Sequence, residues 1–467
     1  MEFNSLFFIF IYLPVFIGLM YFIKDNRIRN YILLAASLLF YCFGDVRHAG
    51  ILFIIILITY LSGLKVRKNK TVLIIYLLLV LGTLSYFKYG NYLVASLSAF
   101  FKSHEWSAII MPLGISFFTF LSISYVCDVY LEKYECERNP LNIILFLSFF
   151  PVVISGPLIR YDRFKSFIDN KMITTDGIAM GLRRFIIGLS KKVIIANQLN
   201  IITSTVINDN TRISLPLAWL AIIAYGIQEY YDFSGYSDMA IAIGQMIGFE
   251  IPENFNDPYF SHSIREYWRR WHMSLGAFIR DYIYIPLGGN RKGKRRKAVN
   301  MIIALTLSGL WHGSTLPFIL WGLINGVLEA GDAYFDGYAS IKKKLHINDG
   351  TRIWRAFQII RTALIAMVLK VYAFKCSNYL QISNLFKGSI GRGVPFSMSY
   401  LRSLDIIHPL IVLGIGFILL FPYIKKKLLS LNEKVPYLYD LSLLGLAVFS
   451  VALIVSGSYS AFVYFQF

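Results

Sequence analysis

The sequence predicts an all-α polytopic membrane protein that forms one domain over residues 1–467. Of these residues 56% are hydrophobic and 16% are charged, whereas soluble proteins carry about 25% charged residues. The mean hydropathy is +0.57, and apolar runs recur from Leu6 to the last residue without a polar stretch long enough for a second domain. These observations exclude a soluble globular enzyme.

The apolar runs are predicted to be helices, because a segment in lipid must pair its own backbone amides. Residues 6–23 are long enough to span a bilayer. They lack a preceding basic region and a following cleavage site, so we expect this helix to be retained. Residues 31–64 predict a hairpin that turns around residues 44–50. The further expected spans are residues 72–87, 109–130, 141–154, 185–202, 215–231, 299–310, 318–328, 356–374, 409–423 and 441–455.

Several of these runs, such as residues 299–310, are too short to cross alone, since a span needs about 20 residues. Irregular backbone at membrane depth is tolerated only where protein or water surrounds it. We therefore expect the short runs to be re-entrant or buried helices that line a protein-walled cavity.

The net charge of +19 comes from 46 Lys and Arg against 27 Asp and Glu. Such a balance can indicate nucleic-acid binding, but in a chain this apolar it is better explained by basic cytoplasmic loops. We expect a lipid bilayer as partner and no nucleic acid. The basic clusters are residues 24–29, 65–70, part of 183–192, 291–297, 342–344 and 425–427. They predict a multi-pass protein of the inner or plasma membrane with both termini outside.

Polar and ionisable residues crowd into residues 228–322, most densely at 228–238 and 261–270. Ionisable groups at membrane depth are expensive, so such a cluster indicates a functional site. The alternative is a cytoplasmic loop with an ordinary solvated face. Trp268 and Trp271 are poor loop residues, which favours the site.

Two of the seven histidines stand out, His272 and His312. His312 follows an apolar run that places it within the membrane, where a neutral imidazole is a natural general base for a hydroxyl proton. A structural histidine bonded to a backbone carbonyl is the alternative for both residues. No metal-ligand spacing, serine-hydrolase elbow or phosphate-binding loop occurs in the sequence.

The densest basic run includes Arg291, Lys292, Lys294 and Arg295, directly after a Gly-Gly-Asn turn. Exposed amides and positive charge together can hold a phosphorylated ligand. On the residues alone a topology anchor is the favoured explanation of the run, because positive charge on the cytoplasmic side needs no ligand.

An ordered series of motifs resembles the membrane-bound O-acyltransferase superfamily, and within it the alginate O-acetyltransferase-like bacterial branch. Each motif alone is weak, but the series over about 85 residues is specific. The motifs are Asp-Phe-Ser-Gly-Tyr-Ser-Asp at 232–238, Pro-Glu-Asn-Phe-Asn at 252–256, Trp-Arg-Arg-Trp-His-Met-Ser-Leu at 268–275, the 280–291 segment with Pro-Leu-Gly-Gly-Asn-Arg, and Gly-Leu-Trp-His-Gly at 309–313, preceded by Phe-Pro-Val-Val-Ile-Ser-Gly-Pro at 150–157 with Arg160 and Tyr161.

This resemblance implies about eleven or more transmembrane or re-entrant helices around a central funnel, with the active-site motifs in residues 228–322. It implies that His312 is the catalytic histidine and His272 a second site residue, and it makes the basic run a candidate contact for coenzyme A phosphates. Acetyl-CoA is then a cosubstrate, with no bound cofactor or metal.

The implied activity is O-acetylation of a cell-surface polysaccharide, an alginate-like exopolysaccharide or peptidoglycan, through an extracytoplasmic serine-esterase-like O-acetyltransferase partner. We expect His312 to act as general base and His272 to orient the donor or to protonate the leaving thiolate. The alternatives are D-alanyl transfer to teichoic acid and a polytopic polysaccharide transporter or flippase, which would also have helices, a cavity and intramembrane charges.

The chain ends in a tail without charge in which four of the last six residues are aromatic. Tails outside the membrane are usually polar. We therefore consider Tyr464 a transient acyl acceptor at the outer mouth of the funnel. An aromatic belt that anchors the last helix at the interface is the alternative.

Overall fold

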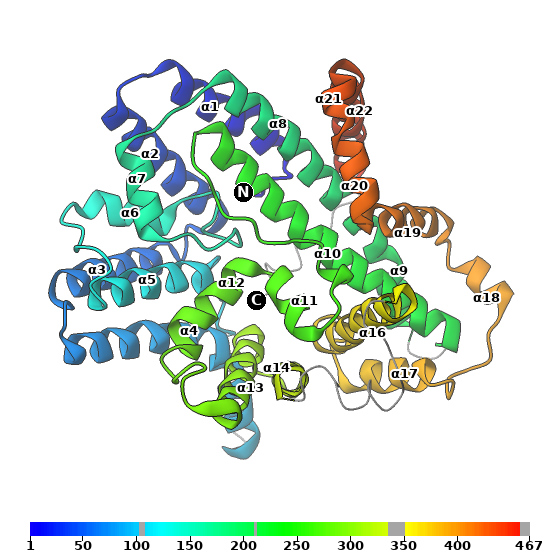
Figure 1. Ribbon diagram of the computed structural model, residues 1–467. Coiled ribbons are helices and arrows are strands. Elements are labelled where there is room, and N and C mark those ends of the chain that lie inside the picture. The colour runs from blue at the N-terminus through cyan, green and yellow to red at the C-terminus, as the bar shows by residue number, and fades with distance from the viewer. Residues whose placement is uncertain (102–107, 210–212, 335–350, 458–467) are drawn as a thin grey trace.

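The computed structural model describes residues 1–101, 108–209, 213–334 and 351–457. Over these ranges the chain is helical, as predicted, and its only β pairing is an isolated bridge between Phe255 and Trp271. Figure 1 shows α10 (Leu215–Met246) running through the middle of the molecule, with the other helices around it.

The N-terminal helices form one side of the molecule. Their bounds are η1 (Phe8–Tyr12), α1 (Leu13–Phe22), α2 (Asn26–Asp45), α3 (Ala49–Lys65), α4 (Lys70–Phe101), α5 (Ile115–Tyr130), α6 (Pro140–Ser148) and α7 (Tyr161–Asp169). The predicted hairpin is confirmed, because α2 and α3 are separated only by residues 46–48. The predicted span at 141–154 is wrong beyond Ser148, since the chain there leaves the helix in a series of buried turns.

The central helices are longer than their apolar runs. Their bounds are α8 (Thr175–Ser190), η2 (Lys191–Ala196), α9 (Asn197–Asn208) and α10. The first three form one apolar stretch from Thr175 to Asn208. The basic residues of 183–192 therefore lie within this helical stretch and not in a loop, and Lys192 is 1% exposed.

The segment with most of the motifs follows α10. Its elements are η3 (Pro258–Phe260), α11 (Ile264–Arg270), α12 (Met273–Ile279), η4 (Arg280–Tyr284), α13 (Gly293–His312) and α14 (Leu316–Tyr334). The helices α13 and α14 form a close hairpin. A Cβ atom on Gly309 would lie 2.4 Å from the carbonyl oxygen of Phe318 and 2.9 Å from the Cα of Gly322. Only glycine permits this approach.

The C-terminal elements complete the fold. Their bounds are α16 (Arg352–Lys370), η6 (Val371–Lys375), α17 (Tyr379–Ser389), α18 (Met398–Ser403), α19 (Ile407–Leu420), α20 (Pro422–Leu429), α21 (Leu431–Lys434) and α22 (Pro436–Val455). The predicted span at 409–423 is bent by 83° after Leu420. Pro422 explains the bend, because proline cannot continue the backbone hydrogen bonding of a helix.

In the described residues, four helical stretches are long and apolar enough to cross a membrane: Lys70–Ser96, Thr175–Asn208, Arg352–Lys375 and Pro436–Val455. The bent pair α19 to α21 is a further candidate, and several shorter helices are also apolar. The two hydrophobic cores, one among α1–α8 and one around α9 and α16, meet on α10, which supplies residues to both. This central helix therefore joins the two halves.

Candidate active site

The polar motif of α10 lies in the helix interior and is buried, so the loop alternative for residues 228–238 is wrong. Its acidic residues are paired with cations from other helices. Lys192 Nζ lies 2.5 Å from Asp232 Oδ1, and Lys370 Nζ lies 3.0 Å from Glu229 Oε2, with all four side chains at most 3% exposed. Pairing offsets the desolvation of these charges, which allows the helix to continue beyond residue 231, where the apolar run ends.

A short backbone bridge joins two of the sequence motifs. The amide of Asn256 donates to the carbonyl of Arg270 at 2.9 Å, and the amide of Met273 donates to the carbonyl of Asn254 at 3.0 Å. The 252–256 motif is thereby held against the 268–275 motif.

Ser274 connects this bridge to the upstream motif. Its hydroxyl donates to Asn254 Oδ1 at 2.9 Å and accepts the backbone amide of Leu158 at 3.0 Å. Arg160, from the same upstream motif, forms an ion pair with Asp281 at 2.8 Å. The motifs that are spread through the sequence therefore meet in one place.

His272 lies directly before α12 with a φ of 48° and is 3% exposed. Its Nδ1 is 3.1 Å from Asn254 Oδ1, an oxygen that also accepts from the amide and hydroxyl of Ser274. An amide oxygen only accepts, so Nδ1 carries the proton and Nε2 presents a lone pair. The Phe233 ring packs almost perpendicular to the imidazole, with 4.7 Å between the ring centres. Asn254 therefore fixes both the tautomer and the ring orientation of His272.

His312 ends α13 and is 4% exposed. Its ring is enclosed by Trp311, Trp321 and Phe374, with centroid distances of 4.4, 5.3 and 4.9 Å. Trp321 in turn packs at 5.4 Å against Trp268 of α11. The ring contacts from His312 to Trp321, and from Trp321 to Trp268, connect His312 to the 268–275 motif that contains His272. The two predicted histidines thus belong to one buried cluster.

A cavity of about 540 Å³ reaches His312. It is also lined by Lys88, Phe374 and Lys375, and Lys375 donates to Asn200 and Ser204 of α9 at 2.8 and 3.0 Å. Because Asn200 also accepts from Gln228 Nε2 at 3.1 Å, this contact places the cavity beside the polar motif of α10.

A second cavity, of about 180 Å³, is lined by Asn254, Asp257 and Lys425 and by residues between Tyr230 and Ile241 of α10. Asn254 belongs to this cavity and its side chain contacts His272, so each of the two histidines lies beside a cavity or beside a residue that lines one.

The remaining predicted site residues are elsewhere. Arg291, Lys292, Lys294 and Arg295 are exposed around the start of α13, a helix of 20 residues whose other end carries His312. At 1.5 Å per residue, about 28 Å separates these ends. Tyr464 lies outside the described residues. Among the described residues, no group of three His, Cys, Asp or Glu side chains is arranged to hold a metal ion.

Three residues that contact or flank the histidines were not singled out from the sequence. Asn254 was present within a motif but had no assigned role, and Lys370 lies at the end of an apolar run. Lys88 is a lone cation near the end of an apolar span, and this was the one signal that sequence reasoning had available.

The helical fold with its apolar spans defines the class of a polytopic membrane protein, and its buried polar motifs contain two histidines. The chain belongs to the membrane-bound O-acyltransferase family, whose family model matches residues 68–336. It is 38% identical over 390 residues to a probable alginate O-acetylase of Pseudomonas syringae pv. tomato, covering 79% of this chain and 71% of the relative.

Two further relatives bear on the activity. A peptidoglycan O-acetyltransferase of Helicobacter pylori is 37% identical over 365 residues, covering 70% of this chain and 69% of the relative. A teichoic acid D-alanyltransferase of Bacillus subtilis is 30% identical over 308 residues, covering 59% of this chain and 77% of the relative. The protein is a multi-pass membrane O-acyltransferase of the alginate O-acetylase-like branch.

Proposed function

We propose that the protein takes acetyl groups from cytoplasmic acetyl-CoA and passes them across the membrane for O-acetylation of a cell-surface polysaccharide. An extracytoplasmic serine-esterase-like O-acetyltransferase would complete the transfer. The observation that carries the proposal is the burial of His272 and His312, with His312 lining one cavity and Asn254, which contacts His272, lining another. The names of the alginate and peptidoglycan relatives support acetyl as the group and a surface polymer as the destination.

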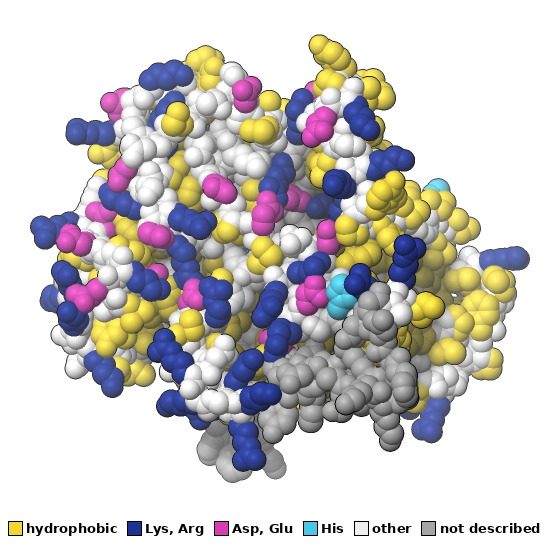
Figure 2. Space-filling model, viewed as in Figure 1, with side chains coloured by type: hydrophobic (Ala, Val, Ile, Leu, Met, Phe, Trp, Pro, Cys, Tyr) yellow, Lys and Arg dark blue, Asp and Glu magenta, His cyan; other side chains and the backbone are white. Residues whose placement is uncertain are grey.

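The distribution of charge supports the orientation. Figure 2 shows Lys and Arg side chains over the face that carries the start of α13, while hydrophobic side chains gather toward the rim. Basic segments remain on the cytoplasmic side. We assign this face to the cytoplasm, which puts the His312 end of α13 toward the outside.

The chemistry follows from the two imidazoles. The acceptor hydroxyl attacks the thioester carbonyl while His312 takes the hydroxyl proton, and collapse of the tetrahedral intermediate breaks the C–S bond. The proton then returns to the departing thiolate, so an ester and a free thiol are formed. His272 orients the donor, with its tautomer fixed by Asn254. Burial keeps water from hydrolysing the thioester.

Thiol release from acetyl-CoA by the purified protein tests this proposal. We expect His312→Ala to lower the rate by at least about 100-fold, the usual contribution of a general base, and His272→Ala to lower it less. His408→Ala provides the control, because His408 is exposed and does not belong to the buried site. Unchanged thiol release in folded His312→Ala protein would remove His312 from the mechanism.

We propose the basic run at the start of α13 as a contact for the phosphates of coenzyme A. Replacing Arg291, Lys292, Lys294 and Arg295 by glutamine is expected to raise the KM for acetyl-CoA. The same variant is expected to use S-acetylpantetheine, which lacks the nucleotide phosphates, as well as the wild type does. An equal effect on both donors would assign the run to topology alone.

Tyr464 remains a proposed relay for the acetyl group. After incubation with labelled acetyl-CoA, mass spectrometry of the C-terminal peptide is expected to find acetyl on Tyr464, and Tyr464→Phe is expected to abolish the label. An unlabelled peptide would favour the role of an interfacial anchor.

A second candidate is D-alanyl transfer to teichoic acid, which the Bacillus subtilis relative favours. Offering acetyl and D-alanyl thioesters to the same preparation separates the two activities. We expect transfer from the acetyl donor, in line with the greater identity to the O-acetylating relatives.

A further inference from the structure

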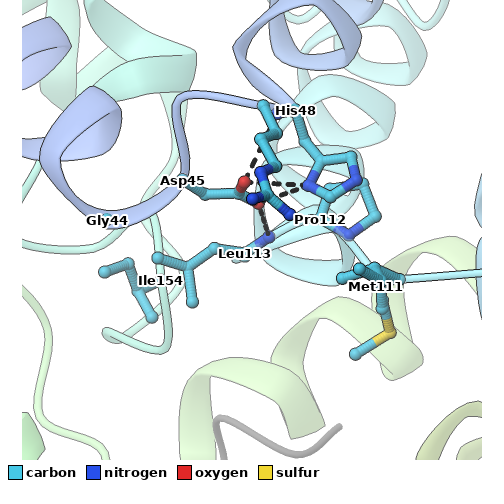
Figure 3. A pocket seen from close by; sticks show the side chains of 10 residues that line it. Gly44, Asp45, His48, Met111, Pro112, Leu113 and Ile154 are labelled. Carbon is cyan, nitrogen blue, oxygen red and sulfur yellow. Dashed lines mark hydrogen bonds and ion pairs between the residues drawn. The ribbon is translucent and has the colours of Figure 1, made fainter.

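A strap of non-helical chain, residues 109–113, lies beside two neighbouring cavities. One is the cavity of about 540 Å³ that His312 lines. The other, of about 320 Å³, lies at the turn between α2 and α3, where Asp45 and His48 line it (Figure 3). Of the described lining residues, only Met111 belongs to both cavities. Figure 3 shows the Met111 side chain pointing away from Asp45 and His48, so Met111 lies at the junction of the two spaces.

Both ends of the strap are fixed by side chains of other helices. At one end, Asn91 of α4 accepts the amide of Ile109 at 2.7 Å and donates to the carbonyl of Ile109 at 2.8 Å. At the other end, Asp45 accepts the amide of Leu113 at 3.0 Å. These contacts satisfy backbone groups that a helix would pair internally. They hold Met111 between α2 and α4.

His48 fixes the carboxylate that holds the strap. Its Nδ1 is 2.8 Å from each oxygen of Asp45, and the two side chains are only 18% and 15% exposed. Rotation of Asp45 away from Leu113 would therefore break its contacts with the imidazole as well. Beyond the strap, Gly114 has a φ of 72°, and a Cβ there would lie 2.3 Å from the carbonyl oxygen of Val153. The chain is packed too closely at this point to shift.

The strap is also fixed relative to the proposed catalytic histidine. Tyr89, two residues before Asn91 on α4, donates its hydroxyl to the carbonyl of Leu310 at 2.9 Å. Leu310 lies two residues before His312 on α13. The helix α4 therefore holds both the strap and the end of α13, so the position of Met111 relative to His312 is set by helix packing.

We infer that Met111 selects acyl acceptors by size, and that Asp45 is a positioning residue that holds the strap for this purpose. The inference rests on the proposed function for the place of the acceptor hydroxyl at His312. An acceptor longer than the first cavity then lies against Met111, whereas a short acceptor does not reach it. A fixed wall discriminates in this way because overlap with it weakens binding of the longer acceptor alone in the transition state.

Ethylene glycol and tetraethylene glycol are the probes, since both are neutral primary alcohols and they differ in length. The readout is the ratio of kcat/KM for the long acceptor to kcat/KM for the short one, measured as ester formed in lipid nanodiscs. One methylene group changes selectivity by about 10- to 200-fold in a substrate pocket. We therefore expect Met111→Trp to lower the ratio by at least about tenfold and Met111→Ala to raise it.

Val46→Trp is the matched control, because Val46 is exposed at the same turn and lines neither cavity. It adds similar bulk one residue from Asp45 and is expected to leave the ratio at the wild-type value. An unchanged ratio in either folded Met111 variant would overturn the inference. An equal change in Val46→Trp would overturn it as well, since bulk at the junction would not be the cause.

Variants of Asp45 test how Met111 is held. Asp45→Ala frees the strap and is expected to shift the ratio in the same direction as Met111→Ala, through the KM for tetraethylene glycol. Asp45→Asn keeps an oxygen that accepts the Leu113 amide and is expected to restore the wild-type ratio. A fall in kcat for both acceptors without a change in the ratio would contradict a positioning role for Asp45.

Failure of the proposed function is recognised separately, as absence of His312-dependent thiol release from acetyl-CoA. The acceptor ratio does not depend on which thioester supplies the acyl group, so a D-alanyl thioester serves as well. Hydrogen exchange of the peptide that contains Leu113 needs no donor at all. We expect faster exchange in Asp45→Ala than in Asp45→Asn and the wild type. Equal exchange in all three would overturn the role of Asp45 even in an inactive preparation.

Discussion

Glu229 and Lys370 form an ion pair in the centre of the molecule, with 3.0 Å between Oε2 and Nζ and side chains only 1% and 2% exposed. The ammonium of Lys370 also stands over the ring of Trp271, the residue before His272. This pair joins α10 to α16 and supports the segment that presents His272. A buried pair of this kind stabilises the fold only while both partners are present.

Removing one partner of this pair is therefore expected to destabilise the protein. Lys370→Met leaves the Glu229 carboxylate buried without its cation, and we expect a loss of about 3–5 kcal/mol in unfolding free energy. The double variant Lys370→Met with Glu229→Gln is expected to recover part of that loss. Thermal unfolding in detergent measures both, and a single variant as stable as the wild type would contradict the structural role of the pair.

Asn254 is expected to act as a positioning residue for His272. Asn254→Ala removes the oxygen that fixes the imidazole; for metal-binding histidines, loss of the partner that orients the ring costs about 10- to 100-fold in affinity or activity. We expect kcat for acyl transfer to fall in this range, with little change in the KM for acetyl-CoA. The exposed Asn256 is the control, because Asn256→Ala leaves its bridging backbone amide in place. Equal effects of the two variants would contradict this assignment.

The close contact between α13 and α14 predicts that replacement by alanine is tolerated at Gly414 but not at Gly309. Gly309→Ala would place a Cβ 2.4 Å from a backbone carbonyl that cannot move aside easily, whereas the Cβ of Gly414→Ala in α19 would meet nothing within 4 Å. Overpacking of this kind costs about 1–3 kcal/mol. We expect Gly309→Ala to lower the Tm and to displace His312, and Gly414→Ala to leave the Tm unchanged or raise it.

Glu137 predicts a dependence of stability on pH in the loop between α5 and α6. Burial opposes its ionisation, but hydrogen bonds from Tyr161, the Asn139 amide and Asn142, together with the charge of Lys165, outweigh this and lower its pKa from 4.5 to about 2. A lowered pKa means that the carboxylate stabilises the fold above pH 4.5, and that this contribution is lost as the pH falls toward 2.

Glu137→Gln measures that contribution. Hydrogen bonds to a charged group are worth about 1.5–3 kcal/mol, so we expect a lower Tm than the wild type at pH 7. The difference is expected to shrink progressively below pH 4.5, as the wild-type carboxylate takes up a proton. A difference that is constant from pH 7 to pH 3 would show that charge is not the cause.

The motifs identified the family and the histidines, because each motif is a pattern of nearby residues that can be recognised in the sequence without the structure. The lengths of the helices were harder to predict from the sequence. The apolar run before Tyr231 ends at the polar motif of α10, yet the helix continues to Met246, since cations from distant segments pair with Glu229 and Asp232. A hydropathy pattern carries no information about such partners.

The sequence by itself determined that this chain is a helical membrane protein with two candidate histidines, because apolar length and motif order are properties of consecutive residues. Only the tertiary structure decided that Asn254 fixes the tautomer of His272 and that Lys88 shares the cavity of His312. These contacts join residues 18 and more than 200 positions apart. They exist because helix packing brings the segments together, and residue order alone does not specify that packing.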